Sequence, residues 1–315
     1  SHERYQIMDS VRRTLETSRA ADSKEEASEE AEIFSAAWSG RKPMEPRKVF
    51  EGIIFVLRTG CQWKALPKKE FGSASSIHQY FLEWKRKGVF SRLWRKGLAE
   101  YDEMEGIAWS WQSIDGATVK APLALEAVGA NPTIGEKNGT KRSLLVDGNG
   151  IPLSLVVSGA QRHDVKLLEP TLDNIVIERP SGKGASRQHL CGDKAYVGQP
   201  AQESIRQRNY IPHIRQRGEE MASKKRNPRY RARRWVVERT HSWLNRFRKL
   251  LVRFEKTTVG YEGLLELACA LIAFRQVILF TDKFKLKEID GYIISDVEEF
   301  PNIPFWILKK DVIQK

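Results

Sequence analysis

Three carboxylates, far apart in the chain, stand where acidic side chains are unusual. Asp115 follows the alternating apolar residues of IAWSWQSI, Asp193 follows the short run HLCG, and Glu238 stands inside a basic segment. Residues 206–253 contain sixteen Lys or Arg but only three acids. Carboxylates gather in a protein interior chiefly where a cation holds them. The three acids together therefore predict a cation site.

The residue types indicate which cation and which chemistry. Oxygen ligands favour Mg²⁺ or Mn²⁺ over zinc, and two such ions about 4 Å apart promote displacement at a phosphodiester. We expect Asp115, Asp193 and Glu238 to be catalytic residues and ligands of two divalent ions. Each acid alone has a plainer interpretation. Asp115 would cap a turn, Asp193 would pair with Lys194, and Glu238 would form an i,i+4 pair with Arg234 worth about 0.2–0.5 kcal/mol.

The segment that carries Glu238 has helical periodicity. Apolar residues recur every three or four positions in RWVVERTHSWLNRFRKL (234–250), without Gly or Pro, which predicts an amphipathic helix. Its apolar side would hold Val236, Trp243 and Phe247. Its polar side would hold Glu238 and His241.

The segments around the two aspartates predict strands and helices in alternation. Two helical patterns, at 163–175 and 200–209, separate segments typical of strands. The predicted strands lie within 107–122, 141–160, 187–198 and 210–216. The segment 141–160 is typical of a hairpin around Asp-Gly-Asn-Gly. This order predicts a mixed α/β sheet covered by helices on both faces.

A helical module precedes the predicted sheet. Helical patterns cover PRKVFEGIIFVLRTG (46–60), the Ser-capped GSASSIHQYFLEWKRKGVF (72–90) and SRLWRKGLAEY (91–101). The second helix would point Gln79, Lys85 and Arg86 outward, as a helix-turn-helix that reads bases would. Because any three-helix bundle has this pattern, subunit pairing is the alternative role.

Composition indicates the class of partner and the compartment. The net charge of +13 and the pI near 9.6 indicate a polyanionic partner, most commonly nucleic acid. No apolar run approaches the roughly 20 residues of a membrane span, so we expect no membrane contact. The start of the chain lacks a signal pattern and the three cysteines are widely spaced, which favours a reducing cytoplasm. Cys191 has the alternatives of a nucleophile and, more typically, a buried thiol.

The changes in composition predict four parts of the chain. They are a polar segment or linker at 1–45, a helical DNA-binding domain at 46–106, a catalytic domain at 107–279, and an extension of unknown role at 280–315.

Several separate motifs resemble the DDE transposases of bacterial insertion sequences, in the group of families four and five. The signature of that group around its glutamate is Tyr-x2-Arg-x3-Glu-x6-Lys. Arg234 and Glu238 match its centre, whereas Arg231 stands at the tyrosine position and Asn245 at the lysine position. The resemblance also covers SIDGATVKAP, GTKRSLLVDGNGIPL, SGAQRHD and CGDKAY, and extends from about residue 46 to residue 277.

The resemblance implies an RNase H-like catalytic core preceded by an all-α, helix-turn-helix-like domain. It implies that Glu238 is the third ligand of two Mg²⁺ or Mn²⁺ ions, presented by a helix that packs on the sheet through Trp243 and Phe247. The implied enzyme binds the terminal inverted repeats of its element, cleaves the DNA and joins the 3′-hydroxyl to target DNA. It would act as a homodimer or larger synaptic complex in the cytoplasm and nucleoid of a bacterium.

Two other classes of function remain as alternatives. One is a former transposase that is kept as a DNA-binding regulator, which loss of a catalytic acid would favour. The other is a stand-alone RNase H-like nuclease, which leaves the helical module unexplained.

Residues expected to contact DNA surround the acids or lie on the second helix of the module. Lys120 and Lys141 flank the predicted active strands, and Arg234 precedes Glu238 by one turn. Asp164 would assist the chemistry or cap the helix that follows it. The full expected set is Gln79, Lys85, Arg86, Lys120, Lys141, Arg142, Arg231, Arg234, Asn245, Arg246, Arg248 and Lys249.

Overall fold

The computed structural model describes residues 44–131, 137–180, 187–214 and 235–288. Arg231, Arg234 and most of the predicted segments 1–45 and 280–315 lie outside these residues. Within them, no helix is long and apolar enough to cross a membrane.

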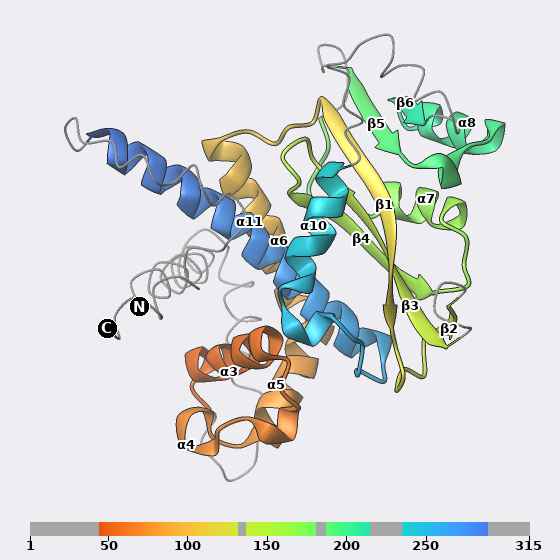
Figure 1. Ribbon diagram of the computed structural model, residues 1–315. Coiled ribbons are helices and arrows are strands. Elements are labelled where there is room, and N and C mark those ends of the chain that lie inside the picture. The colour runs from red at the N-terminus through yellow and green to blue at the C-terminus, as the bar shows by residue number, and fades with distance from the viewer. Residues whose placement is uncertain (1–43, 132–136, 181–186, 215–234, 289–315) are drawn as a thin grey trace, which may run out of the picture.

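A mixed sheet runs through the centre of the structure (Figure 1). Its strands are β1 (Trp111–Lys120), β2 (Gly129–Ala130), β3 (Asn138–Val146), β4 (Pro152–Gly159), β5 (Gln188–Gly192) and β6 (Tyr210–Ile214). β3 pairs antiparallel with both β1 and β4, and with the short β2. On the other side of β1, β5 and β6 continue the sheet in parallel. β1 is therefore the central strand, with an antiparallel neighbour on one side and a parallel neighbour on the other.

Helices flank both faces of this sheet (Figure 1). One side holds α7 (Val165–Asp173) and α8 (Gln199–Gln207), and the other holds α6 (Val89–Met104), α10 (Trp235–Asn245) and α11 (Thr258–Glu288). We call these the α7 side and the α10 side. The predicted mixed sheet with helices on both faces is confirmed.

Neighbouring residues of β3 contact the helices on opposite faces of the sheet. The Thr171 hydroxyl of α7 donates to Ser143 Oγ at 2.8 Å, whereas the Arg142 guanidinium donates to Asn245 Oδ1 of α10 at 2.9 Å. Successive side chains of a strand point to opposite faces, so a single residue step separates the two layers.

The β3–β4 hairpin forms where Asp-Gly-Asn-Gly predicts it. The buried Asp147 carboxylate accepts the backbone N–H groups of Asn149 at 2.9 Å and Ile151 at 2.8 Å, which closes the turn. It also accepts the Tyr101 hydroxyl of α6 at 3.0 Å. The turn is thus fixed to the helix that covers it.

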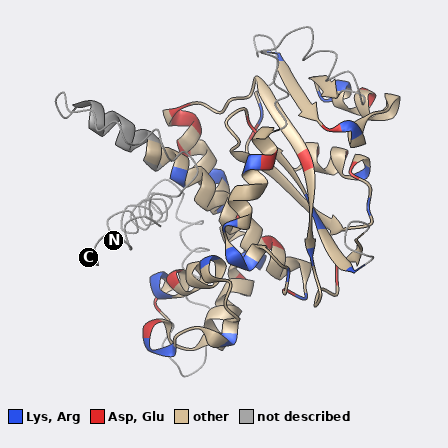
Figure 2. Ribbon diagram, in the orientation of Figure 1, with Lys and Arg blue, Asp and Glu red and all other residues tan. Residues whose placement is uncertain are grey.

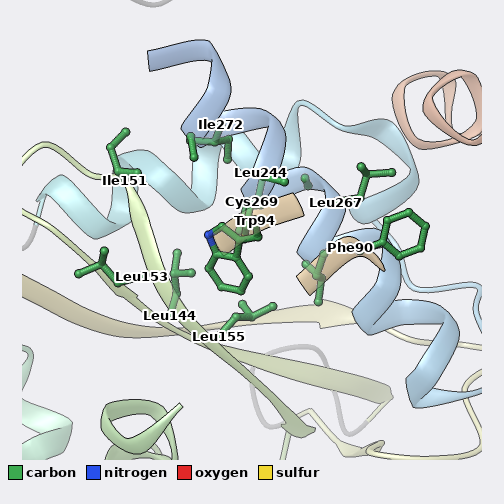
Figure 3. Packing of buried hydrophobic residues seen from close by; sticks show 14 of the residues in the cluster. Phe90, Trp94, Leu144, Ile151, Leu153, Leu155, Leu244, Leu267, Cys269 and Ile272 are labelled. Carbon is green, nitrogen blue, oxygen red and sulfur yellow. The ribbon is translucent and has the colours of Figure 1, made fainter. Parts of the chain in front are cut away.

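The largest fully buried side chain in the described residues is Trp94 of α6, which lies between the sheet and α11. Figure 3 shows its indole among Leu144 and Leu155 of the sheet and Leu267 and Cys269 of α11. The indole N–H donates to the Pro152 carbonyl at 3.0 Å, which satisfies the one polar atom of the ring. Because α6 packs along α11 and against the sheet, a continuous core joins the two domains predicted to meet at residue 106. That boundary stays a prediction.

The helical module contains more elements than the three predicted helices. Between α3 (Pro46–Thr59) and α5 (Ala74–Arg86) lie η1 (Trp63–Ala65) and α4 (Lys68–Phe71). Ser73 caps α5 by accepting the Ser76 N–H. The predicted helix from 72 to 90 is wrong at its end, because Gly88 adopts φ 72° and separates α5 from α6.

The buried face of α10 differs from the prediction. The buried residues are Val236, Val237, Thr240, His241 and Leu244. His241 is therefore not on the polar side. Trp243 and Phe247 are only half-buried.

Contacts with the β3–β4 turn explain this rotation of α10. The Thr240 hydroxyl donates to the Gly150 carbonyl at 2.6 Å, and the Arg239 guanidinium donates to the Asn149 carbonyl. Arg239 also lies over the rings of Trp235 and Trp243, at 4.7 and 4.8 Å from their centroids. The indoles thus cover a cation at the edge of the helix instead of entering the core.

A close approach joins α7 to β1 on the α7 side. Asp164 precedes α7, but its side chain makes no capping hydrogen bond, so the capping interpretation is wrong. Its Oδ1 lies 3.1 Å from Lys141 Nζ. An ideal Cβ on Gly116 would lie only 2.2 Å from the same oxygen. The carboxylate therefore sits in the space that glycine leaves beside β1.

This contact predicts a coupling between Gly116 and Asp164. Gly116→Ala should lower the free energy of unfolding by roughly 1–3 kcal/mol, because the methyl group forces the carboxylate away. In an Asp164→Ala background the same change should cost much less, which urea unfolding of the double-mutant cycle would measure. Asp173→Ala, which removes an exposed ion pair at the other end of α7, is the control background. Equal costs of Gly116→Ala in all three backgrounds would contradict this explanation.

Candidate active site

The pairing of β1 with β5 determines where the two aspartates lie. The strands are parallel and in register through the pair Ser113 and Cys191. Asp115 and Asp193 each come two residues after this pair, so they lie at the same level. Adjacent strands are about 4.8 Å apart. Asp193 stands directly after β5, and its Oδ1 accepts the Ala195 N–H at 2.7 Å. One carboxylate oxygen is thus fixed by the backbone.

The charges that act on Asp115 indicate which other acids lie near it. The pKa of Asp115 is raised to about 6, first by burial and then by the negative charges of Asp193, Asp164 and Glu238, against a hydrogen bond from the Gly116 backbone. The structure therefore brings the three predicted acids into one neighbourhood. Asp164 is a fourth carboxylate that the sequence prediction did not include in this set.

The position of Glu238 depends on the buried face of α10. His241, one turn later, is buried with its ring near the Asp115 backbone. Burial and then the Arg142 charge lower the pKa of His241 to about 3, so the ring is neutral at physiological pH. Glu238 itself is exposed on the flank of the helix. No sequence signal marked His241 as buried, because its spacing fits either side of an amphipathic helix.

The acids fit a divalent cation by donor type and charge. Carboxylate oxygens are the ligands that Mg²⁺ and Mn²⁺ prefer, and bound cations would offset both the burial of the Asp115 charge and its repulsion by the other acids. In the described ranges, however, no three His, Cys, Asp or Glu residues are close enough together to form a ready metal site. The acids share a neighbourhood but are not in a ligating arrangement.

Two basic residues predicted to contact DNA lie inside the fold beside the acids. Lys141 is buried, and its ammonium donates to the Arg162 carbonyl at 2.7 Å while facing Asp164. Arg142 is 1% exposed and is bonded to Asn245. Neither cation presents a surface to DNA. The prediction is wrong for both in this structure, because the sheet uses them to hold α7 and α10, and Asn245 takes part in the second contact.

Two more of the predicted cations join the helical module to the catalytic part. Lys249 is buried between Glu255, at 3.4 Å, and the Cys61 carbonyl, at 3.3 Å. Lys85 of α5 pairs with Glu266 of α11 at 2.7 Å. For Lys85, this ion pair replaces the outward orientation that the helical pattern predicted.

The remaining predicted contacts are more accessible. Gln79, Arg86, Lys120 and Arg248 are exposed, and Arg246 is half-buried. Figure 2 shows Lys and Arg on the helical module and on the segment after α10. Cys191 is buried, in agreement with the simpler of its two interpretations.

The described residues include one hollow away from the acids. It lies between the end of α7 and the end of α8 and is lined by Asp173, Arg179 and Arg208 among others. Arg208 pairs with Asp173 at 2.7 Å, so its charged groups are already partnered. The hollow is not the site that the acids form.

Comparisons with known proteins identify two family matches in the chain. The family "Putative transposase of IS4/5 family" matches residues 30–94, and the family "Transposase DDE domain" matches residues 112–272. The second match covers just over half of the chain and includes all three predicted acids.

Two relatives come from Burkholderia cepacia. A putative transposase for insertion sequence element IS402 is 36% identical over 148 residues, which are 46% of this chain and 68% of the relative. An uncharacterized 16.2 kDa protein of the same element is 32% identical over 96 residues, which are 30% of this chain and 65% of that relative.

A solved structure was also found, that of the Mos1 mariner paired end complex with Mn. It is 11% identical, with a TM-score of 0.24 over 86% of this chain and 92% of that chain. A TM-score this low does not establish a shared fold. The observed sheet and the match to the DDE domain together confirm the RNase H-like class with a helical N-terminal region. The chain belongs to the DDE transposases of the IS4/5 family.

Proposed function

We propose that this protein binds the terminal inverted repeats of an insertion sequence, cleaves the DNA strands and transfers the 3′-hydroxyl into target DNA. Asp115, Asp193 and Glu238 are the proposed catalytic residues and ligands of two Mg²⁺ or Mn²⁺ ions. The observation that carries the proposal is that Asp193 and Glu238 lie close enough to Asp115 for their charges to add to the effect of burial in raising its pKa. All three acids are present, as an active enzyme requires and an idle regulator does not.

Each acid has a different mechanical role in this proposal. Asp115 projects from the rigid central strand, and Asp193 keeps one oxygen free because the Ala195 N–H holds the other. Glu238 is exposed on α10, so its side chain has room to complete the ligand set. When bound, the cations supply activation of the attacking oxygen and stabilisation of the leaving oxygen. The half-buried position of Asp115 strengthens any charge interaction there, because less water screens it.

The proposed DNA contacts are reduced to residues with accessible side chains. They are Gln79, Arg86, Lys120, Arg246 and Arg248 in the part of the chain described, together with Arg231 and Arg234 outside it. The proposed working form is a homodimer or larger synaptic complex on DNA in the bacterial cytoplasm and nucleoid.

Asp193→Asn tests the cation site directly. The variant should lose strand cleavage of end-containing DNA by more than about 100-fold, since even partners of metal ligands are worth 10- to 100-fold. Affinity for the same DNA should stay nearly unchanged. Single-turnover cleavage and filter binding, both with Mg²⁺ present, would measure the two effects. Asp173→Asn, remote from the acids, is the control, and wild-type cleavage by Asp193→Asn would refute the assignment.

The raised pKa of Asp115 predicts a pH dependence of stability in metal-free protein. The folded pKa of about 6 lies above the ordinary value of 3.8, so the folded state binds this proton more tightly than the unfolded state does. Stability from this group is therefore present at low pH and is lost as the pH rises from about 4 to about 6.

Asp115→Asn should remove that loss and stabilise the metal-free protein at pH 7 by up to about 3 kcal/mol. Urea unfolding of both proteins in chelator, at several pH values, isolates the effect because other titrating groups cancel in the difference. Parallel stability curves for wild type and variant would show that the pKa of Asp115 is not raised in the folded protein. Added Mg²⁺ should stabilise the wild type more than the variant.

Substitution of Gln79 and Arg86, whose side chains are accessible, tests whether α5 reads bases. Replacing both with Ala should reduce the preference for end DNA over random DNA, by about 1–3 kcal/mol for each base that a side chain no longer reads. Competition binding at fixed salt would measure this ratio. Lys85→Met should behave differently, with lower stability and unchanged preference, because Lys85 pairs with Glu266. Unchanged preference in the Gln79 and Arg86 variant would indicate that the module serves subunit pairing.

A further inference from the structure

Two segments distant in sequence join to form a ridge at the far end of β1. They are residues 121–127, which follow β1, and residues 251–259, which lead into α11. Val252 forms a bridge with Lys120, and the Arg253 N–H donates to the Lys120 carbonyl at 2.8 Å. The Leu125 N–H donates to the Lys256 carbonyl at 2.9 Å. We call these two segments the ridge.

A buried arginine holds the ridge in place from below. The Arg253 guanidinium donates to Thr140 Oγ1 of β3 at 2.9 Å and to the Ala127 carbonyl at 3.2 Å. It also lies over the Tyr261 ring, 5.0 Å from the centroid. The Glu126 carboxylate accepts the Thr258 N–H at 2.8 Å. The ridge is therefore fixed to the sheet and to α11 by side chains as well as by its backbone.

Several apolar side chains of the ridge are open to solvent. Among the residues whose burial is described, eight large apolar side chains are exposed, and five of them belong to the ridge. Leu125 is 75% exposed. The five are Leu123, Leu125, Leu251, Phe254 and Val259. Such a concentration of exposed apolar side chains on a fixed surface indicates an interaction site.

The charges at the margin of the ridge indicate the chemistry of the partner. Lys120, Arg248 and Lys256 are exposed, and no carboxylate in the described ranges pairs with them. The acids of the two segments point to other groups. Glu126 caps α11, and Glu255 accepts the Trp63 indole N–H and pairs with Lys249. The margin is therefore positive, which suits a polyanion.

We propose that the ridge is a wedge for duplex DNA. Phe254 and Leu125 press between base steps in the minor groove, while Lys120, Arg248 and Lys256 contact the flanking phosphates. Apolar wedges with adjacent cations unstack base steps and bend the duplex in this way. The ridge extends β1, the strand that carries Asp115, so the bend lies on the same DNA that the acids act on. This inference rests on the proposed function and adds a distortion step to it.

The test uses the full chain and end-containing DNA with 2-aminopurine placed at successive positions. Wild-type protein should raise the fluorescence at one or two adjacent positions, because unstacking relieves quenching. Phe254→Ala with Leu125→Ala should abolish at least four-fifths of that rise. Met104→Ala, which removes an exposed apolar side chain elsewhere, should leave it unchanged. Lys120→Ala with Lys256→Ala should reduce the slope of log affinity against log salt by about two phosphate contacts, roughly −0.9 each.

The outcomes separate this inference from the proposed function. Wild-type protein that binds and cleaves end DNA without any fluorescence rise would overturn the wedge and leave the proposed function intact. A double variant that keeps the full rise but sediments as a smaller assembly would overturn it in favour of a second copy of the chain as partner. Failure of the wild type to bind DNA would overturn both. Phe254→Leu, which keeps an apolar side chain, should retain most of the rise and show that loss in the Ala variant is not misfolding.

Discussion

The parallel pairing of β1 with β5 brings two carboxylates to the same level of the sheet, and the other features of the catalytic region are arranged around the charge this creates. Asp115 is half-buried, and Asp193 follows the last residue of β5. Burial first, and then the negative charges of Asp193 and the other nearby acids, disfavour ionisation of Asp115. The result is its raised pKa. A fold keeps such a pair only if the rest of its core is stable enough to hold the two strands in register, and here a buried tryptophan, a hairpin aspartate and α11 provide that stability.

Attachment of α10 to the sheet is the second requirement, because the third acid comes from this helix. Thr240 bonds to the β3–β4 turn, and Asn245 bonds to Arg142 on β3. His241 lies between these contacts as a neutral, buried ring. Glu238 stays on the exposed flank as a consequence. Polar contacts thus fix α10 at its middle and at its C-terminal end, while the acidic side chain lies on the exposed flank of the preceding turn.

Four basic side chains of the described residues are used inside the molecule. Lys141, Arg142, Lys249 and Arg253 are all buried, where each holds one element of the fold to another. Burying a cation is costly unless acceptors surround it, so these positions act as fixed links between layers. The consequence for recognition is that net charge overstates the surface available to DNA. The accessible cations among the residues predicted to contact DNA lie on the helical module, at the end of β1 and after α10.

The sequence alone determined the fold class, and it predicted the three acids and the cation that they suit. These conclusions follow from local signals: alternation at β1, Asp-Gly-Asn-Gly at the hairpin, and an isolated glutamate in a basic helix. The family motifs around Asp115, Asp193 and Glu238 carried the proposed activity. None of these signals requires knowledge of which residues meet in space.

Only the tertiary structure decided the orientation of α10, the partners of the lysines and the approach of Asp164 to β1. His241 and Trp243 both fit the helical period, and the choice between them depended on which side met the turn at Gly150. Lys141 and Lys85 resemble surface lysines in the sequence, because their partners Asp164 and Glu266 are distant in the chain. Such contacts are set by the packing of layers, and hydrophobic periodicity carries no information about them. The ridge is a further example, since its two segments become neighbours only when β1 and the start of α11 meet in the folded chain.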